Sequence, residues 1–115
     1  MIEMVITDLD GTLLRDDKTV SEYDIKTLKK LGKKGICRVA ATGRTFYNLR
    51  VLPDDFPLDY VVFSSGAGIY DWQRKKLLKK YSLLPQQVQR IKKILLEHDV
   101  DFHIYKTIPN NHYFA

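Results

Sequence analysis

Two aspartates near the N-terminus, Asp8 and Asp10, carry the strongest chemical signal in the chain. They follow a short apolar segment, residues 3–7, which reads as a buried strand. Carboxylates two positions apart at a strand end point the same way, and Gly11 then lets the chain turn sharply. Such a pair can supply a nucleophile and a proton-transfer group, whereas the alternative is a solvated acidic turn after an edge strand.

The elements that position this pair alternate between strand and helix. Apolar strands are predicted at residues 3–7, 36–41 and 59–63. A helix is predicted between Ser21 and Gly35, and a short helix through Leu49 follows the second strand. The alternation favours a parallel sheet with right-handed crossovers, in which ligands bind beyond the carboxyl ends of the strands.

The pattern changes after the third strand. Residues 68–71 and 76–81 read as two strands around a turn, and residues 85–98 read as a helix with Pro85 at its start. Residues 101–106 alternate in polarity and are predicted to form another strand.

Three short motifs give the sequence a family resemblance. Asp8-Leu9-Asp10-Gly11-Thr12 ends the first strand, Thr42-Gly43-Arg44 ends the second, and Ser65-Gly66-Ala67 follows the third. In this pattern the chain resembles the haloacid dehalogenase-like (HAD) superfamily of hydrolases, and most closely its Cof-type phosphatases. Ser65 stands where that subfamily usually has Asn. The resemblance implies an HAD-like Rossmannoid α/β fold, with an α+β cap domain inserted after the third strand.

The resemblance also implies a reaction and a cofactor. Asp8 would be the nucleophile that forms an aspartyl-phosphate, and Asp10 would be the general acid and then the general base. Both aspartates would bind Mg²⁺, which suits hard oxygen ligands. The substrate would be a small phosphorylated metabolite of the sugar-phosphate type.

Four further residues are candidates for binding the phosphate: Thr42, Gly43, Arg44 and Gly11. The Thr42 hydroxyl would hydrogen-bond the phosphoryl group, although Thr42 could instead, or as well, be the N-cap of a following helix. Arg44 could contact the phosphate or simply be an exposed arginine at the start of a helix. The two glycines could be needed only for their backbone conformation.

The resemblance raises an expectation about completeness. Cof-type members need a lysine and an acidic metal-binding loop downstream of the cap, and this chain contains neither. We therefore expect an N-terminal fragment, with the core at residues 1–84 and the start of a truncated cap at residues 85–115, that is weakly active or inert. The first strand would have an open apolar edge, which predicts self-association.

Composition limits the other function classes. The 115 residues are 44% hydrophobic and 29% charged, which is typical of a soluble globular protein. A single cysteine, Cys37, excludes an intrachain disulfide, and no secretory signal or membrane span is present, so a cytoplasmic location is expected. The net charge of +5 (19 bases minus 14 acids) lies in the second half, with no aromatic pattern suited to nucleic acid. A phospho-receiver domain and a non-catalytic interaction module remain the alternatives.

Overall fold

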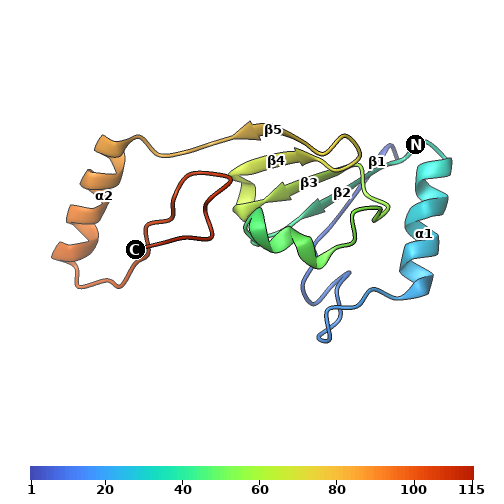
Figure 1. Ribbon diagram of the computed structural model, residues 1–115, viewed down its shortest axis with the longest axis horizontal. Coiled ribbons are helices and arrows are strands. Elements are labelled where there is room, and N and C mark those ends of the chain that lie inside the picture. The colour runs from blue at the N-terminus through green and yellow to red at the C-terminus, as the bar shows by residue number, and fades with distance from the viewer.

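The computed structural model describes all residues, 1–115, and contains one five-stranded mixed sheet (Figure 1). The strands lie in chain order, from β1 at one edge to β5 at the other. Their bounds are β1 Met4–Thr7, β2 Cys37–Ala41, β3 Tyr60–Phe63, β4 Gly68–Asp71 and β5 Lys76–Lys80. The first three strands are parallel and the last two form an antiparallel hairpin, so the predicted α/β class and change of pattern are confirmed.

Helix α1, Glu22–Lys33, forms the first crossover between parallel strands. Its start follows from the local sequence, because the Ser21 side chain accepts a hydrogen bond from the backbone N–H of Asp24. Lysines in the last turn suit the negative end of the helix dipole, and Gly35 follows with a positive φ of 72°. Leu28 is the buried residue of this helix.

The second crossover contains no α-helix. A 3₁₀ turn, η1, spans Tyr47–Val51 and buries Leu49. The predicted short helix is therefore a 3₁₀ turn that begins and ends later in the chain than expected. It starts after Phe46, whose side chain makes no capping hydrogen bond. Pro53 and Pro57 lie just beyond it, which restricts the room for a longer helix.

The hydrophobic core connects the start of the chain with the sheet and the second crossover. Its most deeply buried large side chains come from the loop after β1, the loop before β3 and β3 itself: Leu9, Leu14, Leu58, Val61 and Phe63. Burial of the two leucines after β1 fixes the course of the loop that contains Asp10. Packing of the core therefore fixes the position of the loop that contains Asp10.

Helix α2, Pro85–Glu97, and the segment after it extend away from the sheet at the end toward which β2 and β3 run (Figure 1). The molecule is accordingly elongated, measuring 52 × 29 × 26 Å. The prediction of a strand at residues 101–106 is wrong, because only an isolated bridge joins Tyr105 to Phe114. A strand needs a neighbour along its length, and only the last residues of the chain reach this one.

The outer edge of β1 has no neighbouring strand. Three apolar side chains at or before this strand are largely exposed, with 69% of Ile2, 52% of Met4 and 61% of Ile6 accessible. This is the open apolar edge expected from the sequence. No helix has the length and apolar character needed to cross a membrane.

Candidate active site

The three parallel strands end at the same edge of the sheet, and each is followed by residues singled out from the sequence. Asp8 comes directly after β1, Thr42 directly after β2 and Ser64 directly after β3. The register pairs Thr7 with Ala40 and Ala41 with Val62, so these strand ends lie level with one another. This arrangement matches the place where open α/β sheets bind their ligands.

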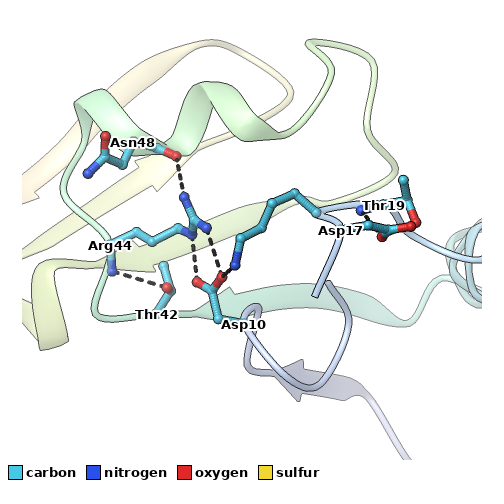
Figure 2. A network of polar contacts seen from close by, with 7 residues as sticks. Asp10, Asp17, Thr19, Thr42, Arg44 and Asn48 are labelled. Atoms are coloured by element: carbon cyan, nitrogen blue, oxygen red, sulfur yellow. Dashed lines mark hydrogen bonds and ion pairs between the residues drawn. The ribbon is translucent and has the colours of Figure 1, made fainter. Parts of the chain in front are cut away.

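Asp10 is held by two cationic side chains from different loops (Figure 2). Arg44 grips both carboxylate oxygens, with its Nε 2.6 Å from Oδ2 and its Nη2 2.7 Å from Oδ1. Lys18 Nζ donates a further bond to Oδ1 at 2.9 Å. Bidentate arginine pairs are among the stronger and more directional polar contacts in proteins, so the orientation of Asp10 is well defined.

These contacts determine the protonation of Asp10. The hydrogen bonds from Arg44, and then from Lys18, hold the pKa of the Asp10 carboxyl well below its usual range. The same pairing raises the pKa of the Arg44 guanidinium. Asp10 is therefore a carboxylate at neutral pH in this arrangement, which suits a proton acceptor.

Thr42 connects the second strand to this ion pair. It is buried, and its Oγ1 accepts a hydrogen bond of 3.1 Å from the backbone N–H of Arg44. Its own N–H donates to the Val62 carbonyl of β3 at 2.9 Å. The alternative role of Thr42 as a helix N-cap is wrong, because η1 begins only at Tyr47.

Asp8 differs from Asp10 in that its carboxylate is exposed and takes part in none of the ion pairs or side-chain hydrogen bonds of the chain. Only its backbone carbonyl is engaged, by the Thr7 hydroxyl at 2.9 Å. Gly11 follows directly after Asp10, with a φ of +74° and open space where a side chain would be. The positive φ explains why glycine suits this sharp turn.

The turn after β3 supports the other two strand ends. Ser64 N–H donates to the Arg44 carbonyl at 2.8 Å, and Ser65 N–H donates to the Thr42 carbonyl at 3.1 Å. Ser64, Ser65 and Gly66 all have a positive φ, of 50°, 52° and 99°. Asn tolerates this conformation better than Ser, so the backbone at position 65 would accept an Asn readily.

Sequence reasoning missed two residues that the fold brings to this edge. Lys18 reaches Asp10 because the loop after Gly11 folds back, through a turn in which Lys18 has a φ of 64°. Asn111 reaches the turn after β3, where its Nδ2 donates to Ser64 Oγ at 2.6 Å. No sequence motif marks either residue, since the first contact depends on the course of the loop after Gly11 and the second on packing between distant parts of the chain.

The oxygen donors present fit a magnesium ion only in part. Asp8 offers a free carboxylate, and the Asp10 carbonyl receives no backbone hydrogen bond, so both could serve a hard cation. However, the chain contains no group of three or more His, Cys, Asp or Glu side chains placed to hold a metal. The Mg²⁺ assignment therefore has two candidate ligands in this chain and lacks further acidic ones.

Comparison with known proteins places this arrangement in a family. The sequence model of the haloacid dehalogenase-like hydrolases matches residues 5–113. A Buchnera aphidicola protein is 35% identical over 100% of this chain, which spans 45% of that protein. The 5-amino-6-(5-phospho-D-ribitylamino)uracil phosphatase of Bacillus subtilis is 28% identical over 88% of this chain and 41% of its own length.

A solved structure agrees with the sequence comparisons. It is that of a phosphatase of the haloalkanoate (HAD) superfamily from Bacteroides thetaiotaomicron, which is 29% identical. The two folds agree with a TM-score of 0.80 over 99% of this chain and 41% of the other. The chain thus spans less than half the length of these relatives. With the motifs at all three strand ends in their expected places, the chain belongs to the haloacid dehalogenase-like hydrolase family, in its Cof-type branch.

Proposed function

We propose that this chain supplies the nucleophile and the proton-transfer group of a phosphatase that hydrolyses small phosphate monoesters. The observation that carries the proposal is the contrast between the two aspartates. Asp8 has a free, exposed carboxylate beside the strand ends, whereas Asp10 is oriented by Arg44 and Lys18. One carboxylate is thus available for attack, and the other is fixed in a position to handle a proton.

The reaction proceeds in two displacements at phosphorus. In the first, a carboxylate oxygen of Asp8 bonds to phosphorus, the ester P–O bond breaks, and the alcohol oxygen takes a proton from Asp10. In the second, water attacks the aspartyl-phosphate, Asp10 accepts its proton, and Asp8 is released together with inorganic phosphate. For the first step, Asp10 must carry a proton, so its contacts with Arg44 and Lys18 must loosen when substrate binds.

The phosphoryl group is held by the residues that end the second strand. The Thr42 hydroxyl and the backbone at Gly43 lie beside the Arg44–Asp10 pair and can hydrogen-bond phosphoryl oxygens. Arg44 could contact the phosphate once it leaves Asp10, and Gly11 lets the chain turn sharply after Asp10 with open space where a side chain would be. A Mg²⁺ ion bound through Asp8 and the Asp10 carbonyl would neutralise negative charge between nucleophile and phosphate.

The substrate class follows from relatives and from charge. The named Bacillus subtilis relative acts on a phosphorylated uracil derivative, and another relative, from Klebsiella pneumoniae, is an HMP-PP phosphatase. The compounds in both names are small and phosphorylated. The basic second half of this chain, with nine bases and four acids in residues 61–115, would attract such anions.

The test is a matched pair of aspartate variants in the full gene product. Asp8→Asn should abolish release of phosphate from a panel of sugar and nucleotide phosphates, with an unchanged melting curve, because the amide is a poor nucleophile. Asp16→Asn is the control, since Asp16 is an exposed acid in the following loop and pairs with no cation. Retained turnover in Asp8→Asn would refute the proposal.

A further inference from the structure

A pocket of about 510 Å³ lies between the sheet and the segment that extends beyond it. Its inner end is formed by Gly43 and by three residues at the turn after β3: Ser64, Ser65 and Ala67. Its outer walls come from α2, which extends away from this edge of the sheet (Figure 1), and from residues 102–108. The pocket has the size of a small-molecule site and opens beside the candidate phosphoryl-binding residues.

The inner end of the pocket is polar and tied to the active site. Ser65 is exposed there, and its Oγ lies only 3.5 Å from the place where a Cβ on Gly43 would stand. The backbone N–H of Ser65 donates to the Thr42 carbonyl, so the backbone of Ser65 is one hydrogen bond away from the proposed phosphoryl site. Ser65 holds this place in a left-handed conformation, a form of backbone strain that concentrates at functional sites.

A buried amide closes the floor of the pocket. Asn111 is 7% exposed and donates to Ser64 Oγ, while its own Oδ1 is buried without a partner in the chain. A buried amide oxygen without a donor is costly, which points to a missing hydrogen-bonding group nearby. The floor therefore combines two hydroxyls and an amide that together suit a polyfunctional alcohol.

The outer walls have a different chemistry. Several apolar side chains line them: Val88, Ile91, Leu95, Phe102, Ile104 and Ile108. Lys92 of α2 and Lys106 are the flexible cations among the lining residues, and no aspartate or glutamate lines the pocket. A ligand here meets positive charge, apolar surface and no opposing carboxylate.

We propose that this pocket receives the alcohol portion of the substrate and selects one that carries a second anionic group. Ser65 contacts the alcohol portion next to the phosphoryl group, the apolar walls cover its faces, and Lys92 and Lys106 hold the second anion, a carboxylate or a phosphate. This assignment rests on the proposed phosphatase function and makes it more specific.

The test compares three aryl phosphates of similar shape: phenyl phosphate, 4-carboxyphenyl phosphate and its neutral analogue 4-carbamoylphenyl phosphate. The full gene product should prefer the carboxylate over the carbamoyl compound by about tenfold in kcat/KM, since each of two exposed ion pairs, to Lys92 and to Lys106, contributes about threefold. Lys92→Gln and Lys106→Gln should each reduce this ratio about threefold, and the double variant should bring it near one. Equal ratios in the double variant and the unaltered protein would overturn the proposal.

A neighbouring lysine provides the matched control. Lys93 lies next to Lys92 on α2, does not line the pocket, and pairs with Glu97 at 3.9 Å, so Lys93→Gln should keep the preference. A fall as large as that of Lys92→Gln would mean that net charge, and not the pocket, sets the ratio. Dissociation constants of the same compounds, measured by calorimetry, test the selectivity of the pocket separately from the phosphatase activity. Selective binding without hydrolysis would reject the phosphatase and keep the pocket, whereas hydrolysis without selectivity would reject the pocket alone.

Discussion

Removing the guanidinium of Arg44 should destabilise the chain mainly through Asp10, because its other side-chain contact is a single longer hydrogen bond, 3.3 Å, to the Asn48 carbonyl. Exposed ion pairs contribute about 0.2–1 kcal/mol, while breaking a fully buried pair costs about 3–5 kcal/mol. Here the side chain of Arg44 is 20% exposed, that of Asp10 is 41% exposed, and two short bonds join them. The pair lies nearer the exposed limit, so we expect Arg44→Gln to lower the free energy of unfolding by about 1–1.5 kcal/mol.

A double-mutant cycle isolates this pair from other effects of the substitutions. Urea unfolding at pH 7 of Arg44→Gln, Asp10→Asn and the double variant should give a coupling energy of about 1 kcal/mol. The parallel cycle with Lys18→Gln should give about 0.3 kcal/mol, because Lys18 makes a single bond and its side chain is 52% exposed. Both couplings should shrink in 1 M salt. An Arg44–Asp10 coupling no larger than that of Lys18–Asp10 would refute the assignment of Arg44 as the main clamp on Asp10.

Three other predictions concern stability and association. The Arg38 guanidinium holds the pKa of Asp59 below its usual value, so this carboxylate stabilises the fold above about pH 4 and ceases to do so as the pH falls through its lowered folded pKa. Urea unfolding at pH 7 and pH 3 should show a larger loss in the unaltered chain than in Asp59→Asn, and equal losses would contradict the pairing. Ser65→Asn should raise stability by about 0.5 kcal/mol, since Asn accepts the φ of 52° more readily, whereas Ser65→Val should lower it; a stabilising Val in thermal unfolding would argue against backbone strain. Ile6→Lys on the open edge of β1 should lower self-association in light scattering after size exclusion, and a monodisperse unaltered monomer would show that this edge does not pair.

The parts of the site that depend on strand ends could be predicted from sequence. Asp8 and Thr42 lie together because parallel strands share an edge, and the apolar runs before them mark those strands clearly. The hydrogen-bond partner of Arg44 could not be predicted in this way. Its choice of Asp10 depends on the loop after β1 being anchored by buried leucines, which no local pattern reports.

Prediction failed where an element depends on distant partners. The alternating pattern at 101–106 is compatible with a strand, yet a strand forms only where a neighbour offers a ladder of hydrogen bonds, and here Tyr105 alone is bridged. Similarly, Asn111 meets Ser64 across 47 positions of the chain. Contacts of this kind follow from tertiary packing. A short stretch of sequence contains only one of the two partners, so it cannot indicate the contact or the entropy cost of closing the loop between them.

Helix α2 extends away from the sheet (Figure 1), whereas the segment after it returns to the turn after β3 through Asn111 and Ser64, so the structure does not test the predicted division at residues 84 and 85. It stays a prediction as a boundary between domains. The relatives described above are more than twice as long as this chain.

The central claim is that Asp8 forms a bond to phosphorus, and trapping that bond tests it most directly. The full gene product is mixed with a hydrolysed phosphate ester and Mg²⁺, quenched in acid during turnover, and mapped by peptide mass spectrometry. We predict a phosphate adduct on Asp8 that is absent from Asp8→Asn. An adduct on another residue, or full turnover by Asp8→Asn, would contradict the account.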